Sequence, residues 1–511
     1  MKNKQHKIII GAIIIFVVIV GILTFIVPPA VYPDPGWGFL VMRSMHLGGG
    51  FNLIVGPSPA NISKNSEVFL AWWSPGQYVI PYFFKSIFSV NTGQASAITV
   101  TICSLSGLVG FYLFFKKIGF TPIIAAISLV FIMCQQDFWT PFAFYNGGEI
   151  LLFAFEGWFL YVCVLLSKVD FKLIIFVLLS GWIGFICKSS FMWIYASGLL
   201  CLWIRLSANK SGVLAWVKNG LLLAIPAIIS LASIYFLFIS KGENPTSQSN
   251  GFKLVWEAFA FPLASPVLAG FSVDDLLHGL IVHLGAMPIV SPAARLVTLL
   301  SLAVISMVLV VIILMFVPNK NYKLFIIVFY TVSVSFFGYS YLHQAIISYE
   351  ARHFRMIGLL VVPGIIYMVS KLKIYWQLVF VVLCLGIAHQ SEKFMVGMHE
   401  GNREDAHGVS GISLPFIDQP SLNYIRLLDK QNSNLVFVFL STDLCQEIEH
   451  NRVITYVDDM SPFQGHAGPL CILTPITFSE KRVEGMLTFF PGYKRFTTTK
   501  LSGMYVLYSA K

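Results

Sequence analysis

Long apolar runs separated by short polar connectors fill the chain up to about residue 390. A helix needs about 20 predominantly apolar residues to cross the hydrocarbon core of a bilayer, and most of these runs approach that length. The pattern therefore predicts about eleven membrane-spanning helices joined by short loops. The expected helices are residues 8–27, 94–115, 119–135, 147–167, 172–188, 190–206, 214–240, 293–317, 323–343, 355–370 and 374–390.

Basic residues collect in alternate connectors between these runs, which is the pattern of cytoplasmic loops in membrane proteins. It predicts a cytoplasmic amino terminus, an extracytoplasmic carboxyl terminus and a retained first helix. The chain carries no organelle signal and its loops are modest, so we expect a multi-pass protein of a bacterial inner membrane. The orientation signal lies in Lys116, Lys117, Lys168, Lys172, Arg205, Lys210, Lys218, Lys320, Lys323, Lys371 and Lys373.

Composition supports a lipid environment, since 57% of the residues are hydrophobic, 11% are charged and the mean hydropathy is +0.77. The net charge of +10 does not indicate nucleic acid, because the basic residues are dispersed over connectors rather than gathered on one soluble face. The eight cysteines form no C-x-x-C motif and no Cys/His cluster, so no metal site or other cofactor is expected. Cys445 and Cys471 lie outside the apolar runs and are either paired or two free thiols.

Two domains are predicted: a transmembrane domain at 1–390 and an extracytoplasmic α/β domain at 391–511. The first contains a large outer loop at 28–93 and an outer connector at 241–292, where amphipathic patterns at 252–259 and 271–280 indicate helices lying in the membrane interface. In the second, strand-like runs alternate with one helical segment at 421–430. The expected strands are 434–440, 452–457, 470–474 and 504–508.

Several carboxylates stand at or near the outer ends of the predicted helices. Asp34 lies between Pro33 and Pro35 in the first outer loop, where it is either an active-site carboxylate or a cap of the helix that follows. Glu149 and Glu156 are two turns apart on one helix and either serve the site or pair with a buried cation such as Lys188; for Glu156 we favour the pairing. Asp137 is a further outer-surface carboxylate.

Five polar groups crowd one helix entrance in the stretch 348–364, S-Y-E-A-R-H-F-R-M-I-G-L-L-V-V-P-G. An arginine side chain offers a planar fork of donors that suits phosphate oxygens, and the alternative is an interfacial anchor that snorkels to the headgroups. Five such groups exceed what anchoring needs, so we favour a phosphate site. They are Tyr349, Glu350, Arg352, His353 and Arg355.

These stretches resemble the GT-C superfamily of polytopic glycosyltransferases, particularly the dolichyl-phosphate-mannose protein mannosyltransferases and the bacterial aminoarabinose transferases. Asp34, in Y-P-D-P-G-W-G, stands where that family has an aspartate shortly after its first helix. W-W-S-P-G-Q-Y at 72–78 looks like its W-x-P-P-G-Y segment, and Y-E-A-R-H-F-R-M-I-G-L-L-V-V-P looks like its E-x-R-Y-x-x-P-x-x-P helix entrance. A second acid, usual beside the aspartate in the family, is replaced here by Pro35.

The resemblance implies a helical GT-C fold and transfer of a sugar from a polyprenyl-phosphate donor to a saccharide, lipid or protein acceptor on the extracytoplasmic face. It implies that Arg352, with Arg355, His353 or Lys188, holds the lipid phosphate, and that Asp34 is the general base of one inverting displacement. Sugar stacking would fall to Trp37, Trp72 and Trp73. Supporting positions would be Asp137, Glu149, Glu350 and Tyr78.

Two other classes of protein remain open at this point. A transporter or flippase for a lipid-linked saccharide would show inverted repeats and helices broken near the bilayer centre. A noncatalytic scaffold would use its outer domain to recruit partners and would have no cavity beside Asp34.

Overall fold

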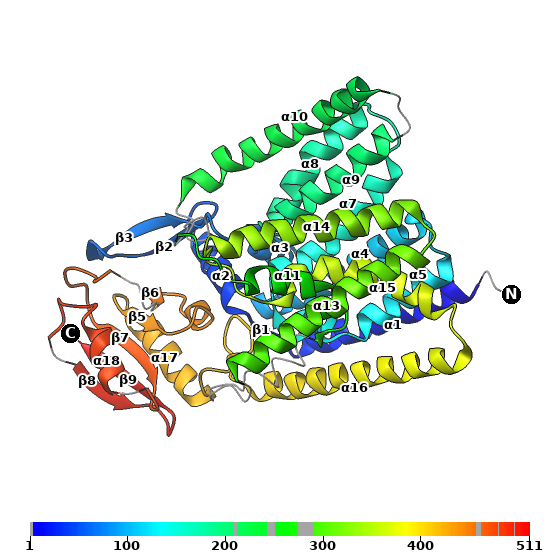
Figure 1. Ribbon diagram of the computed structural model, residues 1–511. Helices are drawn as coiled ribbons and strands as arrows, with labels where there is room; N and C mark the ends of the chain where they lie inside the picture. Colours follow the sequence, from blue (N-terminus) through cyan, green and yellow to red (C-terminus); the bar gives the residue numbers. More distant parts are fainter. Residues whose placement is uncertain are drawn as a thin grey trace. The chain divides into compact units, whose positions relative to one another are not determined.

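The computed structural model describes residues 4–208, 212–242, 251–273, 291–455, 461–478, 480–494 and 496–510 (Figure 1). The chain divides into two compact units. Unit 1 comprises Met1–Ile19, Thr101–Thr140 and Gly148–Met395. Unit 2 comprises Val20–Val100, Pro141–Gly147 and Val396–Lys511. The predicted division at residues 390 and 391 stays a prediction.

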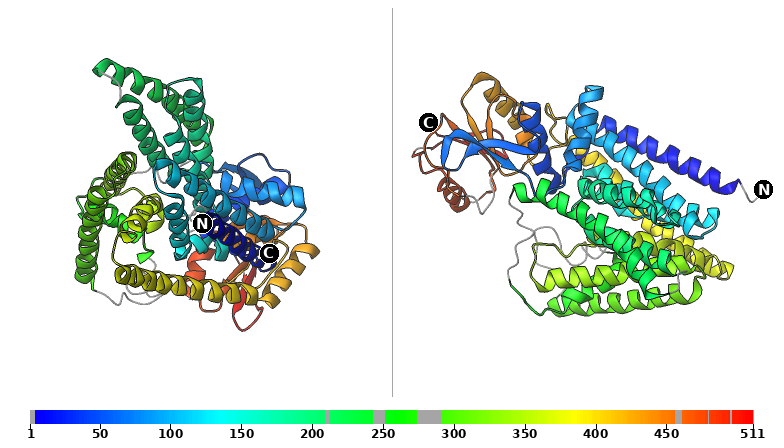
Figure 2. Two further views of the ribbon diagram at one scale, coloured as in Figure 1. Left: turned by 90° about the vertical axis from the view of Figure 1, so that its right-hand side faces the viewer. Right: turned by 90° about the horizontal axis from the view of Figure 1, so that it is seen from above.

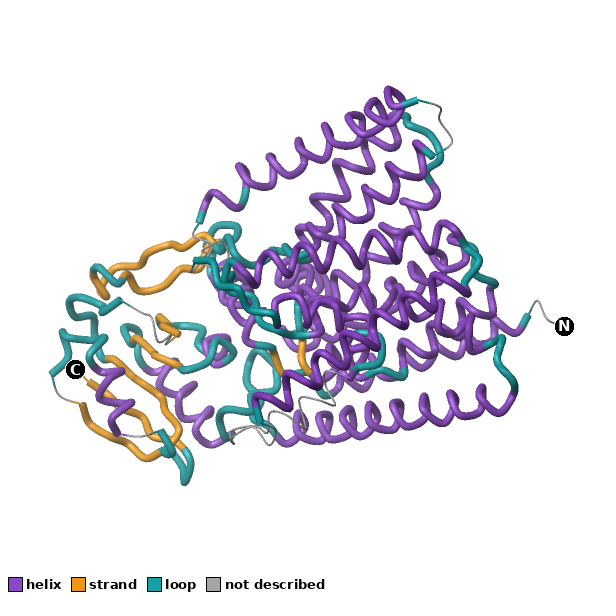
Figure 3. The backbone as a smooth tube through the Cα atoms, in the orientation of Figure 1, coloured by secondary structure: helices purple, strands orange, loops and turns teal. Residues whose placement is uncertain are grey.

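Unit 1 is helical throughout its described residues, and Figure 3 shows the strands in the other unit. Four helices, α1 Gln5–Ile26, α4 Thr92–Ile118, α6 Gln136–Ala143 and α16 Ile374–Glu404, run from one unit into the other. The remaining elements of unit 1 are α5 Pro122–Met133, α7 Gly148–Leu165, α8 Phe171–Cys187, α9 Phe191–Ser207, α10 Val213–Leu237, η1 Ile239–Lys241, α11 Glu257–Leu268, α13 Pro292–Phe316, α14 Lys320–Leu342, η3 Ala351–Phe354 and α15 Arg355–Val369.

Helices occupy all the predicted places, but they do not all have the length of a membrane span. In the described part of the chain eight helices are long and apolar enough to cross a membrane, or nine if α5 and α6, which meet at a bend of 54°, form one broken span. The 17-residue helices α8 and α9 fall short of the roughly 20 residues that a bilayer requires. The protein is therefore a multi-pass membrane protein, as predicted.

Helix packing in unit 1 forms two groups. The helices α7, α8, α9 and α10 pack on one another, while α11 packs against α13, α14 and α15, and α9 meets α14 (Figure 2). Glycines permit close approach of α4 and α7: a Cβ on Gly110 would lie 2.9 Å from the backbone nitrogen of Trp158. Small residues at such crossings let helices in lipid gain van der Waals contact, and this contact fixes α7.

The carboxyl-terminal part of unit 2 is a five-stranded sheet, as an α/β domain requires. Its strand order is β6-β5-β7-β9-β8, with β5 parallel to β6 and β7, and β9 antiparallel to both of its neighbours. The elements are α17 Gln419–Gln431, β5 Val436–Phe439, η4 Leu444–Glu447, β6 Arg452–Thr455, β7 Leu470–Pro475, α18 Glu480–Leu487, β8 Phe496–Lys500 and β9 Tyr505–Ala510.

Both faces of this sheet are covered, which explains the continuous apolar run of β5. Phe437 and Phe439 enter one core with Ile425 of α17, whereas Val436 and Val438 enter a second core on the opposite face. The sequence located β5, β6, β7 and β9 but missed the exposed edge strand β8 and helix α18. Cys445 and Cys471, whose pairing was left open, are free thiols.

The first outer loop is more ordered than the sequence indicated. It contains β1 Ala30–Val31, α2 Pro33–His46, the antiparallel hairpin β2 Leu53–Ser58 and β3 Asn61–Phe69, and α3 Gly76–Phe88. Strand β1 pairs in parallel with β4 Phe144–Tyr145. Pro33 begins α2 because a helix leaves its first N–H groups unpaired, so a residue without an N–H costs nothing there.

The outer connector at 241–292 lies partly outside the described residues, including most of the predicted helix at 271–280. The helix predicted at 252–259 is wrong in its bounds, since α11 runs from Glu257 to Leu268. Its side chains Ala258, Ala264 and Leu268 are buried in the packing with α13, α14 and α15.

Candidate functional site

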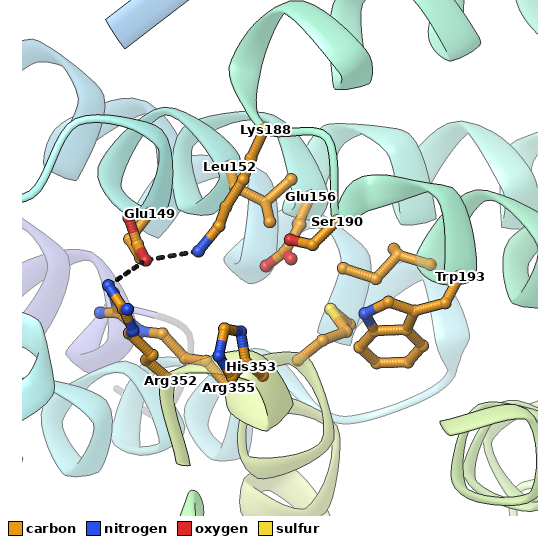
Figure 4. Close-up of a pocket in the computed structure, with 11 residues that line it drawn as sticks. Glu149, Leu152, Glu156, Lys188, Ser190, Trp193, Arg352, His353 and Arg355 are labelled. Carbon is orange, nitrogen blue, oxygen red and sulfur yellow. Dashed lines mark hydrogen bonds and ion pairs between the residues drawn. The ribbon is translucent and has the colours of Figure 1, made fainter. Parts of the chain in front are cut away.

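A buried carboxylate of unit 1 joins two cations from different elements. Glu149 stands in the first turn of α7, Lys188 ends α8 with an extended backbone, and Arg352 lies in η3 just before α15. Lys188 Nζ donates to Glu149 Oε1, and Arg352 Nη1 donates to the same oxygen at 3.2 Å (Figure 4). The side chains of Glu149 and Lys188 are only 11% and 15% exposed.

These side chains line a cavity of about 20 Å³, which has room for about one water molecule. Figure 4 shows the carboxylates and Lys188 on one side and Arg352, His353 and Arg355 on the other. The lining contains three permanent cations and two carboxylates, and therefore an excess of positive charge. Its members are Glu149, Leu152, Glu156, Lys188, Ser190, Trp193, Ile194, Arg352, His353, Arg355 and Met356.

The predicted residues around this cavity hold one another in place. Arg355 lies over the ring of Phe153, 4.9 Å from its centroid, and interacts electrostatically with Asp137 and Glu156. Glu350 forms an ion pair with Arg352 Nε, so two nitrogens of this guanidinium are held by separate carboxylates. His353 Nε2 lies 3.3 Å from the hydroxyl of Ser348.

The two cations of this cluster form an anion-binding arrangement in which the Glu149 carboxylate is the bound anion. A buried ion is expensive unless it is paired and hydrogen-bonded, and Glu149 provides the pairing for both Lys188 and Arg352. A phosphate oxygen can accept the same charge-assisted hydrogen bonds from Lys188 and Arg352. The cavity is too small to add a phosphate group, so such a ligand can bind only by displacing the Glu149 carboxylate from its two cations.

In unit 2, Asp34 stands in the first turn of α2 between Pro33 and Pro35. A negative charge is favoured there by the helix dipole. The N-cap residue is Tyr32, so Asp34 is within the helix and is not its cap. Three residues on, Trp37 occupies the same helix face, and its ring meets that of Trp72 edge-on with 6.4 Å between the centroids.

Four buried polar atoms of residues 73–77 and 146, in unit 2, have no hydrogen-bond partner in the described part of the chain. The atoms are Trp73 Nε1, Ser74 Oγ, Gln77 Nε2 and Asn146 Oδ1, and the whole Gln77 side chain is 3% exposed. A Cβ on Gly147 would lie 2.8 Å from Gln77 Oε1 and 3.0 Å from Pro35 Cβ, so the three residues are neighbours. Unpaired buried groups cost about 1–3 kcal/mol each, and such a group is a sign of a binding surface.

Tyr78 has its hydroxyl committed within unit 2. The residue is fully buried and donates to Asn52 Oδ1, while Asn52 Nδ2 donates to the carbonyl oxygen of Leu70 at 3.0 Å. Burial raises the pKa of this hydroxyl above its ordinary value. An acceptor-binding role for Tyr78 stays a prediction.

The structure brings together five of the predicted residues at the cavity and pairs a sixth, Glu350, with Arg352. Sequence reasoning missed Gln77 and Asn146, although Gln77 stands in a motif that it examined, W-W-S-P-G-Q-Y. Within the described residues no group of three or more His, Cys, Asp or Glu side chains is arranged to hold a metal ion.

No model of a known protein family and no curated protein matches the sequence. The fold is nevertheless similar to that of solved structures. ArnT from Cupriavidus metallidurans bound to undecaprenyl phosphate is 12% identical, with 98% of each chain covered and a TM-score of 0.51. The Archaeoglobus fulgidus oligosaccharyltransferase in the apo form is 11% identical, covering 88% of this chain and 64% of that chain, with a TM-score of 0.49. The likeness to ArnT establishes that the chain has the GT-C fold, as the sequence predicted.

Proposed function

We propose that this protein is a membrane glycosyltransferase that moves a sugar from a polyprenyl-phosphate donor to an acceptor at the extracytoplasmic face. The observation that carries the proposal is the pair of cations, Lys188 and Arg352, on one buried carboxylate oxygen. The fold agrees with it, since the similar ArnT structure holds undecaprenyl phosphate.

In this mechanism the donor phosphate takes the place of the Glu149 carboxylate between Lys188 and Arg352. The bond from the anomeric carbon to the phosphate oxygen breaks, and its electron pair stays on the phosphate. Both cations stabilise that charge, and they do so more strongly than in water because the site is buried. His353 and Arg355 line the same cavity and hold this arrangement.

Asp34 is the proposed general base. As the acceptor hydroxyl or amine attacks the anomeric carbon from the face opposite the phosphate, the proton of the acceptor passes to the Asp34 carboxylate. One displacement inverts the anomeric configuration. Gln77 and Asn146, next to Pro35, would offer their unpaired amide atoms to hydroxyl groups of the substrates.

The test is a transfer assay with the full-length protein in lipid nanodiscs and a radiolabelled undecaprenyl-phosphate sugar. We expect release of undecaprenyl phosphate with sugar transfer by the wild type, and loss of both in Asp34→Asn and Arg352→Ala. Arg403→Ala, which removes an exposed arginine, is the matched control and should retain transfer. Full activity of Asp34→Asn would remove the base from the mechanism.

A transporter of a lipid-linked saccharide is the second candidate, and the 54° break between α5 and α6 favours it, because broken helices are typical of transporters. Such a protein would move the labelled lipid across the bilayer without cleaving it. The same assay separates the two, since only a transferase releases undecaprenyl phosphate.

A further inference from the structure

A second cavity, of about 420 Å³, lies in unit 2 at the carboxyl ends of the parallel strands β5 and β6. Leu440, Ser441, Thr442 and Asp443 directly follow β5, and Thr455 is the last residue of β6. Ligands of α/β sheets bind at this end of parallel strands, where the loops open. The volume is that of an ordinary small-molecule pocket.

Aromatic side chains line this cavity. Phe416 is 63% exposed and Tyr32 is 38% exposed, although both border a hollow of the protein. The ring of Tyr32 meets that of Phe144 edge-on at 6.2 Å, and Trp37 completes the wall. Large rings left exposed at a cavity contribute little to folding, so they indicate a ligand that covers them.

The polar groups of the cavity are hydroxyls and one carboxylate. The hydroxyls belong to Tyr32, Ser441, Thr442 and Thr455 and the carboxylate to Asp443, while Trp37 adds an indole N–H. None of the lining residues in the described part of the chain is Lys, Arg or His. A cavity without a cation does not select a phosphate or another anion. Hydroxyls and a carboxylate beside aromatic rings suit a neutral molecule with many hydroxyl groups and apolar C–H faces, which is the chemistry of a sugar.

A second hollow, of about 290 Å³, lies on the same unit and shares the lining residues Trp37 and Thr455 with this cavity. Residues of the β2–β3 hairpin and of β6 form the rest of its wall. Arg43, the one cation among its described lining residues, is held by backbone oxygens: Nε donates to the carbonyl oxygen of Ile448 at 2.8 Å and Nη2 to that of Asn451 at 2.9 Å.

The first turn of α2, which carries Asp34, lies beside these two hollows. A Cβ on Gly36 would lie 3.0 Å from Thr442 Cβ, so the turn that carries Asp34 packs directly on the loop after β5. Trp37, which lines both hollows, follows Asp34 by three residues on the same helix face. A ligand in the groove therefore lies within one helical turn of the proposed base.

We propose that this groove, formed by the two hollows around Trp37, binds the saccharide part of the acceptor. The inference rests on the proposed function and selects a saccharide from among the possible acceptors. The competing occupant is a peptide that adds a strand to the sheet edge at β6, which would use backbone hydrogen bonds and not the aromatic walls.

The experiment measures binding to the full-length protein in nanodiscs, without any donor. The probes are a printed array of neutral oligosaccharides of two to six sugar units and, in parallel, a library of unmodified peptides. We expect one group of oligosaccharides to bind and to change the intrinsic tryptophan fluorescence. Phe416→Ala and Thr442→Val should each weaken that binding by about tenfold, the effect of losing one aromatic or hydrogen-bonding contact.

Phe51→Ala is the matched control, because Phe51 is an aromatic residue of the same unit that is 57% exposed and lines neither hollow. It should bind the oligosaccharides as the wild type does. Absence of oligosaccharide binding, binding of peptides in its place, or unchanged binding by Phe416→Ala would each overturn the inference. Binding of undecaprenyl phosphate should be the same in Phe416→Ala and the wild type, so failure of the donor site is seen separately.

Discussion

Lys188 and Arg352, from elements far apart in the sequence, donate to the same carboxylate oxygen, Oε1 of Glu149. Without the carboxylate between them, the two buried cations would repel each other. The Glu149 carboxylate allows both to occupy a buried position. The protein thus carries an internal anion where the proposed donor phosphate binds. This competition leads to predictions about each partner.

Removing the charge of Glu149 should lower the stability of the protein and increase its affinity for undecaprenyl phosphate. In Glu149→Gln the two cations lose their charge partner, so the free energy of unfolding should fall by about 3–5 kcal/mol, as for other broken buried pairs. The same loss removes the competitor of the phosphate, so undecaprenyl phosphate should bind more tightly. Thermal unfolding with and without the lipid measures both effects, and the increase of Tm on adding lipid should be larger than in the wild type.

Glu350→Gln is the control for this change. Glu350 also pairs with Arg352, but its side chain is 42% exposed, so water replaces the lost interaction and both effects should be small. Weaker lipid binding by Glu149→Gln than by the wild type would contradict the idea that Glu149 competes with the phosphate.

Arg352 should not be replaceable by lysine. Its Nη1 serves Glu149 while its Nε serves Glu350, and an ammonium group cannot reach both with a fixed planar geometry. We expect Arg352→Lys to reduce kcat for sugar transfer by roughly ten- to a hundredfold, in line with charge-assisted hydrogen bonds of about 1.5–3 kcal/mol. Steady-state kinetics in nanodiscs gives the value, and wild-type kcat in Arg352→Lys would show that only the charge matters.

Replacing Gln77 should stabilise the protein and reduce its activity. Its buried Nε2 atom has no partner among the described residues, so Gln77→Met removes an unpaired group at nearly constant volume. The free energy of unfolding should rise by about 1 kcal/mol. The rate of sugar transfer should fall at least about tenfold if the amide binds a substrate hydroxyl. Chemical denaturation and the transfer assay are read on the same preparation.

Asn52 provides the contrast to Gln77, since both ends of its side-chain amide are used, by Leu70 and Tyr78. Asn52→Leu leaves these partners unpaired and should lower the free energy of unfolding by about 1–3 kcal/mol. If Gln77→Met proves as destabilising as Asn52→Leu, the Gln77 amide has a structural role and the binding interpretation is wrong.

Two aspartates of unit 2 should give opposite pH dependences of stability. Burial raises the pKa of Asp443, and its hydrogen bonds offset this only in part, so the folded form holds the proton more tightly and stability is lost as pH rises through the raised pKa. Burial also acts on Asp418, but hydrogen bonds from Ser502 and Ser421 outweigh it and lower the pKa, so stability is lost as pH falls through the lowered pKa.

Thermal unfolding of the full-length protein between acidic and neutral pH tests this pair. Asp443→Asn should lower Tm at acidic pH relative to neutral pH. Asp418→Asn should lower Tm at neutral pH relative to acidic pH. A shift of both pH profiles in the same direction would contradict the assignment.

The sequence predicted the membrane helices and the strands of the sheet core because contact with lipid, or burial in the sheet core, gives them continuous apolar runs. It missed β8, F-T-T-T-K, because an exposed edge strand has no apolar face to reveal it. It also missed the β2–β3 hairpin, whose residues from Ser63 to Asn65 are exposed and polar. The break between α5 and α6 falls at Cys134 and Gln135, where no glycine or proline announces it.

For the site, the cost of a charge in lipid was enough to expect that a glutamate pairs with Lys188. The pairing was favoured for Glu156, whereas the structure pairs Lys188 with Glu149. Both glutamates lie on one helix face, and only the position of Lys188 at the end of α8 decides between them. Gln77 stayed hidden for a different reason. An amide in an aromatic motif has no charge and no spacing rule that distinguishes a packed residue from a binding one.

The central claim, that Lys188 and Arg352 bind a polyprenyl phosphate, is tested most directly by measuring the Kd of undecaprenyl phosphate for the full-length protein in nanodiscs. Wild type and Arg403→Ala should bind alike, whereas Arg352→Ala should bind at least about tenfold more weakly, since it loses a charge-assisted hydrogen bond. Equal Kd values for Arg352→Ala and the wild type would contradict the claim.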